Sequence, residues 1–331
     1  MKLPVLGVDI SKASFDACLI SNGKAKHQKF TNDNAGFKEL IKWLAQNKVK
    51  KIHACMEATG RYYEALAEFL CDKKHTVSVI NPTKIKGFAK SELARSKTDK
   101  LDAALIARFC EQKRPPAWQP TSEEIREVQE ITHYLEALKK NQTQEKNRLQ
   151  SGLKVKAVKE AIQRHLDDLA IQIAELEKLL KEHAKKHEKL NKHYKLITSV
   201  IGVGDVTAFA WLGEMGYAET FLRTRQVEAF VGLTPSQNQS GTSVCGNDRL
   251  SKVGNNYLRK SLYMPAMSAI QHNPIICDFA ARLKQAGKPS KVIICAVMRK
   301  LLRIIFAVVR SKKPFDLNYK SKSMHELISA V

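Results

Sequence analysis

Four acidic residues in the first third of the chain have the types and the setting to bind divalent cations. Asp9 ends an apolar run that predicts a strand buried on both faces, and Glu57 ends a second short apolar run. Asp99 and Asp102 stand three residues apart at a predicted helix start, so they share one helical face. Because a buried carboxylate needs a cation, and carboxylate oxygens suit Mg²⁺ or Mn²⁺, the set predicts a metal site. Two such ions would support in-line displacement at phosphorus.

Each acid also has a simpler interpretation when it is taken alone. Asp9 could begin a turn at the end of its strand, and Glu57 could be a capping or surface residue. Asp99 and Asp102 could be first-turn acids that interact with the helix dipole. The order favours the metal site: a strand that ends in Asp, a strand that ends in Glu, and then an Asp pair on a helix.

The charge of the chain indicates a partner that carries phosphate. Lys and Arg number 56 against 33 Asp and Glu, which gives a net charge of +23 over 331 residues. Such a balance suits nucleic acid better than a small neutral substrate, although a ribosomal or membrane-surface protein would also fit. With 44% hydrophobic residues the chain is long enough for two or three domains with cores.

Cysteine usage and hydropathy favour a cytoplasmic protein outside the membrane. The seven cysteines are widely spaced without a CxxC pair, so neither a disulfide framework nor a zinc site is expected. Residues 1–4 lead directly into the first predicted strand, so no signal peptide is expected. The apolar run 292–309 carries Arg299, Lys300 and Arg303, which disfavours a transmembrane helix. We expect an amphipathic helix there, with an apolar side in a core and cations on phosphates or in solvent.

The first third of the chain predicts an α/β layer fold. Three strands joined by turns occupy residues 5–30, with a hairpin signal at residues 21–24. A helix is expected over residues 34–46, a strand before Glu57, a helix over 62–70 and a strand over 76–80. Strands and helices that alternate after an opening meander are typical of such layers.

A long helical region follows Pro120. Apolar residues recur at intervals of three or four over 125–138 and again over 162–180, with Lys and Glu between them. This spacing is typical of a coiled coil, and Ser151-Gly152 predicts a bend between the two helices. The seam could be a hairpin within one chain or a contact between protomers. We expect a helical arm that also helps the protein to oligomerise.

The C-terminal part contains two candidate phosphate-binding segments. The first is a turn at Gly202 and Gly204 between two apolar helices, which could present backbone N–H groups to a phosphate or could simply be a tight turn. The second is a polar loop over residues 230–242, followed by basic residues and a helix from about Asn256. This loop could bring a hydroxyl to a phosphate held by Arg249, Lys252 and Arg259, or it could be a solvated loop with a basic face.

Several motifs together resemble a known family. They are Gly-Val-Asp-Ile-Ser-Lys at 7–12, Met-Glu-Ala-Thr-Gly at 56–60, Lys-Thr-Asp-Lys-Leu-Asp-Ala at 97–103, the turn at 202–204, Gly-Leu-Thr-Pro at 232–235, Gln-Ser-Gly at 239–241 and Lys-Val-Gly-Asn at 252–255. The chain is similar over essentially its whole length to DEDD-type insertion-sequence transposases, the bridge-RNA-guided recombinases. Its first third also resembles the ribonuclease-H-like fold of RuvC-type nucleases, with the same order of acids.

The resemblance implies three domains. They are a RuvC-like nuclease domain over 1–118, a coiled-coil arm over 119–192, and a mainly helical transposase domain over 193–331 with a helix-hairpin-helix-like segment. It implies metal binding by the four acids and a nucleophilic serine at Ser240, although Ser236 and Ser243 lie in the same loop. No His is next to Ser240 in the sequence, so a metal or a metal-bound carboxylate is the expected activator.

The resemblance also implies partners. They are donor and target DNA, a structured non-coding guide RNA that reads sequence by base pairing, and further copies of the chain in a dimer or tetramer. The predicted nucleic-acid contacts are Lys97, Gly202, Gly204, Arg249, Lys252 and Arg259.

Three other functions fit parts of the sequence. A RuvC-like structure-specific endonuclease of the Holliday-junction type would need the four acids but not Ser240. A sugar kinase or actin-like ATPase can also end its first strand in Gly-x-Asp, but it needs a second Gly-rich phosphate loop, which the sequence lacks. An RNA-binding protein without catalytic activity would need only the basic residues.

Overall fold

We describe the protein from a computed structural model that covers residues 3–58, 60–92, 98–236, 239–240, 244–245 and 249–318, without the side chains of residues 99, 239–240 and 244–245. The chain divides into two units, Met1–Pro120 and Thr121–Val331. Each unit is described by itself.

The first unit is built on one five-stranded sheet. Its elements are β1 (Val5–Ile10), β2 (Ser14–Ser21), β3 (Lys24–Thr31), α1 (Asn34–Gln46), β4 (His53–Glu57), α2 (Glu64–Asp72), β5 (Thr76–Ile80), α3 (Pro82–Ser91) and α4 (Asp99–Lys113). The strand order is β3-β2-β1-β4-β5, and β2 alone runs against the others. The predicted α/β arrangement is confirmed, whereas the ribonuclease-H-like assignment stays a prediction.

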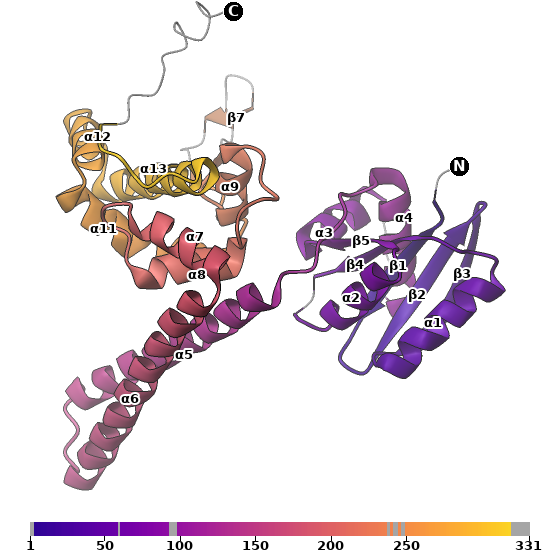
Figure 1. Ribbon diagram of the computed structural model, residues 1–331, viewed down its shortest axis with the longest axis horizontal. Coiled ribbons are helices and arrows are strands. Elements are labelled where there is room, and N and C mark those ends of the chain that lie inside the picture. Colours follow the sequence, from indigo (N-terminus) through magenta and orange to yellow (C-terminus); the bar gives the residue numbers. More distant parts are fainter. Residues whose placement is uncertain are drawn as a thin grey trace, which may run out of the picture. The chain divides into compact units, whose positions relative to one another are not determined.

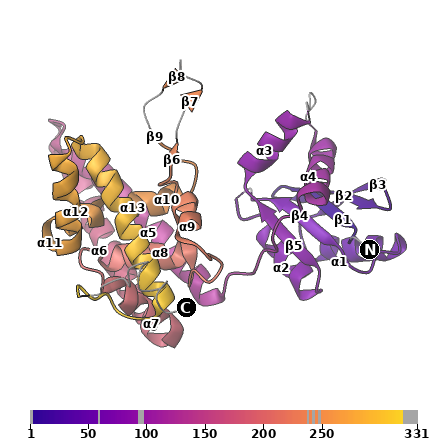
Figure 2. The same ribbon diagram turned by 90° about the horizontal axis from the view of Figure 1, so that it is seen from above.

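Helices cover both faces of this sheet (Figures 1 and 2). Because side chains alternate along a strand, Leu6 and Val8 of β1 enter the core under α1 and α2. Val5 enters the opposite core under α3 and α4. The predicted helix over residues 62–70 begins two residues later, at Glu64, and ends at Asp72.

Gly7 sets the distance between β1 and α4. A β-carbon at Gly7 would lie 2.2 Å from the carbonyl oxygen of Ala103 and 2.2 Å from the backbone nitrogen of Ala107. No side chain fits such a gap, so only glycine allows the helix backbone to rest directly on the strand. Ala103 and Ala107 are fully buried at this contact.

The second unit is mainly helical. It comprises α5 (Glu123–Gln150), α6 (Lys156–Lys186), α7 (Glu188–Thr198), α8 (Asp205–Met215), α9 (Thr224–Val231), α10 (Asn256–Ser261), α11 (Tyr263–His272), α12 (Pro274–Gln285) and α13 (Ser290–Ser311). Four two-residue strands lie between α9 and α10: β6 (Pro235–Ser236), β7 (Gln239–Ser240), β8 (Val244–Cys245) and β9 (Arg249–Leu250).

The helices α5 and α6 form a hairpin within one chain (Figure 1). Gly152 lies between them with φ +82°, at the predicted bend. Lys139 of α5 reaches Glu177 of α6 at 2.6 Å, and Leu135 and Leu169 are buried in the core that both helices share. The seam therefore contains intramolecular packing, while coiled-coil geometry stays a prediction.

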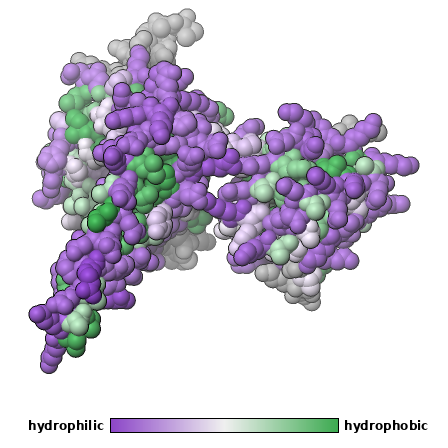
Figure 3. Space-filling model, turned by 60° about the horizontal axis from the view of Figure 1, so that its bottom comes forward, coloured by the Kyte–Doolittle hydropathy of each residue, from purple (hydrophilic) through white to green (hydrophobic). Residues whose placement is uncertain are grey.

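Apolar side chains come to the surface near the far end of this hairpin (Figure 3). Val155 is 60% exposed and Val158 is 43% exposed, at the start of α6. Most of the rest of the face in Figure 3 is hydrophilic, as the charge of the chain leads one to expect. The apolar end is a surface that a partner could cover.

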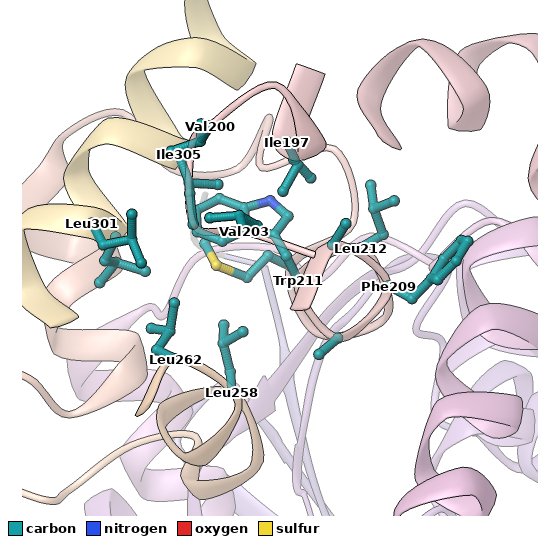
Figure 4. Close-up of a cluster of buried hydrophobic side chains, with 14 of the residues drawn as sticks. Ile197, Val200, Val203, Phe209, Trp211, Leu212, Leu258, Leu262, Leu301 and Ile305 are labelled. Carbon is teal, nitrogen blue, oxygen red and sulfur yellow. The ribbon is translucent and has the colours of Figure 1, made fainter. Parts of the chain in front are cut away.

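The core of the second unit gathers around Trp211 of α8 (Figure 4). This side chain is fully buried, with Ile197 from α7, Leu258 from α10 and Leu301 from α13 in the same cluster. Side chains from α7, α8, α10 and α13 therefore pack in one core around a large aromatic ring.

The run predicted to be an amphipathic helix is α13, and its apolar side is buried as expected. The expectation that its cations face phosphates or solvent is wrong in part. Arg299 and Arg303 both bond to Glu228, a carboxylate of α9 that is fully buried. In the part of the chain that the structure describes, no helix has the length and hydropathy needed to cross a membrane.

Replacing Gly7 tests the contact between β1 and α4. We expect Gly7→Ala to destabilise the first unit by about 2–3 kcal/mol, because the methyl group overpacks against the α4 backbone. Hydrogen exchange measured by mass spectrometry should accelerate in the peptides that contain β1 and α4.

The matched control is Gly87→Ala in α3, where no atom lies within 4 Å of the added carbon. That change should stabilise the unit by up to about 1 kcal/mol, because alanine is the better helix former. Equal exchange rates in the Gly7→Ala variant and the wild-type protein would contradict this account of the contact.

Candidate functional site

The carboxyl-terminal ends of β1 and β4 place two of the predicted acids side by side. The strands are parallel neighbours, and their register continues to put Asp9 beside Glu57, at the spacing of about 4.8 Å between paired strands. Asp9 shares the sheet face of Gly7, which α4 covers, and Glu57 shares that of Cys55, which packs in the same core. Both acids are half-buried.

Helix α4 brings the other two acids to the same edge of the sheet. The Cys110 thiol near the end of α4 donates to the carbonyl oxygen of His53, the first residue of β4, at 3.5 Å. The helix therefore runs back along the sheet from the edge where Asp9 lies. Asp99 is its first residue, and Asp102, one turn later, is half-buried.

The donor atoms at this edge are of the right kind for a metal. Carboxylates from two strand ends and one helical turn are oxygen ligands of the sort that Mg²⁺ and Mn²⁺ prefer. Among the described side chains, which exclude that of Asp99, no three His, Cys, Asp or Glu residues are grouped so as to hold a metal ion. The backbone thus gathers the four acids at one edge, and coordination of a metal stays a prediction.

A further acid at this edge escaped the sequence reasoning. Asp16 of β2 lies directly opposite Asp9, and its carboxylate is 3.5 Å from the Lys29 ammonium of β3. The position of Asp16 is set by the turn between β1 and β2, because the register of these two strands decides which residue lies opposite Asp9.

The candidate serines lie on a short ribbon in the second unit. Ser236 of β6 is opposite Arg249 of β9 and is exposed, whereas Ser240 of β7 is opposite Val244 of β8. Ser243 lies outside the described residues, as does the side chain of Ser240. The backbone therefore puts Ser236 at the base of the ribbon and Ser240 farther along it, and the choice between them stays a prediction.

Arg259 holds the base of this ribbon. Its guanidinium donates to the carbonyl oxygens of Val231 at 2.9 Å and Lys252 at 3.2 Å, and to the side chain of Asn256 at 2.8 Å. These bonds tie the end of α9, the segment after β9 and the start of α10 together. The structure thus gives Arg259 a role within the protein, and its predicted contact with nucleic acid stays untested.

A buried carboxylate supports the other side of α10. Glu214 accepts from His133 at 2.5 Å and from the amide of Asn255, the residue that caps α10. Burial opposes ionisation of Glu214, but these hydrogen bonds and the charge of His133 outweigh it and hold its pKa below the usual value. The Glu214 carboxylate therefore holds Asn255 in place, at the end of the segment that carries the candidate serines.

The turn at residues 202–204 packs on the protein through Gly202. A β-carbon there would lie 2.8 Å from the Cα of Ala269 in α11, and its φ is +97°, so the position requires glycine. Gly204 is exposed and precedes α8, whose first residue, Asp205, accepts from Tyr194 and pairs with Lys181 at 2.7 Å. Close packing explains Gly202, and phosphate binding by the turn stays a prediction.

Three predicted nucleic-acid contacts remain: Lys97, Arg249 and Lys252. Lys97 lies outside the described residues. Arg249 and Lys252 are exposed on the same side of the ribbon base, where both line one groove of the second unit.

Two family models and several known proteins are similar to this chain. Residues 6–157 match a family model described as a transposase, and residues 194–281 match the model of the IS116/IS110/IS902 transposase family. The chain is 34% identical over 330 residues to the pilin gene-inverting protein of Moraxella bovis, which covers 98% of this chain and 100% of that relative. It is 26% identical over 300 residues to the transposase for insertion sequence element IS1111A of Coxiella burnetii, over 82% of this chain and 79% of that protein.

Removing the guanidinium of Arg259 tests its role at the ribbon base. We expect Arg259→Ala to lower the free energy of unfolding of the second unit by about 2 kcal/mol, because two carbonyl oxygens lose a charged donor. Urea denaturation and hydrogen exchange over residues 230–260 would measure the loss.

The control is Lys252→Ala, which removes a neighbouring exposed cation but no donor to the backbone. It should change the free energy of unfolding by about 0.5 kcal/mol or less. If the two variants were equally stable, Arg259 would not hold the ribbon.

Proposed function

The chain belongs to the IS116/IS110/IS902 family of transposases and is therefore a DNA-processing enzyme, and we propose that it recombines DNA through Ser240 and four acids. The reaction joins the ends of an insertion sequence to target DNA. The observation that carries the proposal is the shared sheet edge where β1, β4 and α4 bring Asp9, Glu57, Asp99 and Asp102 together.

The serine would act as a temporary attachment point for DNA. The Ser240 hydroxyl oxygen attacks a backbone phosphorus, the bond from phosphorus to a deoxyribose oxygen breaks, and that oxygen leaves as a hydroxyl carrying the proton. A hydroxyl from another strand end then attacks the phosphoserine and restores Ser240. The energy of the phosphodiester is thus kept in the Ser–O–P bond, and no nucleotide cofactor is needed.

The four acids would support this step in two ways. They would hold Mg²⁺ or Mn²⁺, whose charge polarises phosphoryl oxygens and stabilises the charge that develops on them. Their backbone positions on a strand pair and a packed helix, rather than on loops, would help to hold the carboxylates in fixed positions. The acids and Ser240 belong to different units, so the reaction requires that the two meet.

We propose that a non-coding guide RNA selects donor and target DNA by base pairing. The net charge of +23 supports contacts with the backbones of both nucleic acids. Base pairing would read the sequence, so the protein needs few side chains for base recognition.

We propose a homo-oligomer, a dimer or tetramer, because strand exchange handles several DNA ends at once. The exposed apolar end of the α5–α6 hairpin supports this, since Val155 and Val158 would lose contact with water in an assembly. The size of the assembly could be measured by light scattering of the protein with its DNA.

A second candidate is inversion of a DNA segment within one molecule. It is favoured by the 34% identity over 330 residues to the pilin gene-inverting protein of Moraxella bovis. Inversion and transposition would use the same strand exchange and differ in the arrangement of the sites. A plasmid with two recombination sites in inverted orientation, followed by sequencing, distinguishes the two outcomes.

The role of the acids is tested by neutral isosteres. We expect Asp9→Asn and Asp102→Asn each to reduce recombination at least about a hundredfold, because each removes a ligand of the ions that offset charge at phosphorus. Binding to DNA should stay within a few-fold of the wild-type protein. Recombination would be measured by sequencing of junctions, with and without EDTA.

Asp72→Asn is the control, because Asp72 is an exposed acid at the end of α2, away from the candidate edge. This variant should recombine at the wild-type rate. Full activity of Asp9→Asn would refute the metal role of the acids.

The role of the serine is tested by trapping the protein on DNA. Ser240→Ala should remove a covalent protein–DNA adduct seen after denaturation, whereas Ser236→Ala and Ser243→Ala should retain it, because only one hydroxyl bonds to phosphorus. If the adduct persisted in Ser240→Ala and vanished in either other variant, the nucleophile would be that serine. DNA cleavage by Ser240→Ala without any adduct would instead favour a junction endonuclease.

A further inference from the structure

A groove of about 1190 Å³ lies between the ribbon base and helices α12 and α13. We call it the α13 groove. The ribbon base supplies Arg249 and Lys252, α12 supplies Arg282, and α13 supplies Lys291 and Lys300. The lining residues taken from the described part of the chain also include Arg299 and Arg303, and none of them is acidic. Seven cations around one groove make it a strong site for a polyanion.

A buried carboxylate holds two of these cations, Arg299 and Arg303, in place. The Glu228 carboxylate accepts from Arg299 at 2.6 Å and from the Nε of Arg303, and it is fully buried while the arginines are 30% and 50% exposed. Burial opposes ionisation of Glu228, but the two arginines outweigh it and hold its pKa below the usual value. Glu228 and the two arginines together carry a net charge of +1. Arg303 is more exposed to the groove than Arg299.

Other cations are held by an aromatic ring. The Lys300 ammonium lies 4.4 Å from the centre of the Phe279 ring, and the Arg282 guanidinium lies 5.9 Å from it. Burial and the charge of Arg282 lower the pKa of Lys300, with Asp278 acting in the opposite direction. Like charges are therefore crowded around one ring, and an anion would relieve their repulsion.

The rest of the lining is apolar. Val292 is 50% exposed, and Ala296, Ile304 and Ala307 also line the groove and are at least partly exposed. An inorganic anion or a small phosphate would use the cations and leave this apolar surface in water. A ligand with phosphates and flat apolar groups would cover both.

We propose that the α13 groove binds single-stranded nucleic acid, with phosphates on the cations and unpaired bases against the apolar lining. The proposal rests on the proposed function and adds to it a place for a strand separated from its partner. A duplex fits less well, since its bases are paired and stacked and cannot cover Val292 or Ile304. The groove adjoins the base of the serine-bearing ribbon through Arg249 and Lys252.

The test uses oligonucleotides of on the order of 12 residues, oligo-dT and oligo-rU, and a DNA duplex of equal length. Binding to the full chain is measured by fluorescence anisotropy over a range of salt. Lys291→Gln/Lys300→Gln should weaken single-strand binding at least about tenfold. It should also reduce the slope of log K against log salt by about 1.4, since each lost phosphate contact is worth about 0.7 on a single strand.

The matched control is Lys284→Gln/Lys288→Gln, which removes two exposed charges from the same α12–α13 region but none from the groove lining. The control should bind single strands within about threefold of the wild-type protein, and duplex binding should fall equally in both variants. Loss with oligo-dT, oligo-rU or both supports the groove and identifies the strand that it takes.

Two outcomes would overturn the proposal. One is equal weakening by the groove variant and the control, which would mean that only overall charge matters. The other is a greater loss with the duplex than with the single strands. Asp9→Asn should bind the oligonucleotides normally, so failure of the recombination hypothesis and failure of the groove give different results.

Discussion

The backbone of α4 rests directly on β1 because Gly7 has no side chain, and the position of the candidate site depends on this contact. The strands alone bring only Asp9 and Glu57 together. Asp99 and Asp102 reach the same edge only because the helix that carries them lies along the sheet and runs away from that edge. A larger side chain would lift the helix by the width of at least one methyl group, and the backbone positions of the four acids would no longer share one edge. A contact that only glycine permits is thus next to the proposed chemistry of the first unit.

Buried carboxylates have a comparable organising role in the second unit. Glu214 accepts from the residue that caps α10, and Glu228 accepts from two arginines of α13. Each stays ionised in spite of burial because cations or amide donors reach it from other helices. An apolar residue in either position would leave those donors without their acceptor. Buried carboxylates in this strongly basic chain therefore orient several of its cationic side chains.

The sequence predicted much of the fold because the relevant signals are local. Alternation and turn residues predicted the strands and the hairpin, and the 3–4 spacing with Gly152 predicted the two long helices and the bend. The common edge of the acids followed in outline from their positions at strand ends and a helix start. Asp16 was missed, because its place opposite Asp9 depends on pairing register. The role of Gly7 was missed too, because no sequence pattern predicts which helix will pack against a given glycine.

Charge is where sequence reasoning had least power, because a cation in a sequence does not show its partner. Arg259, Arg299 and Arg303 were expected to face phosphates or solvent, yet each donates to carbonyl or carboxylate oxygens of its own unit. The planar guanidinium, with several donors in a fixed arrangement, suits such internal bonds. Lys252, Lys291 and Lys300 lie around the same groove as compact charges on flexible stems. A strand that moves during recombination needs contacts that adapt, and lysines supported by a frame of fixed arginines meet that requirement.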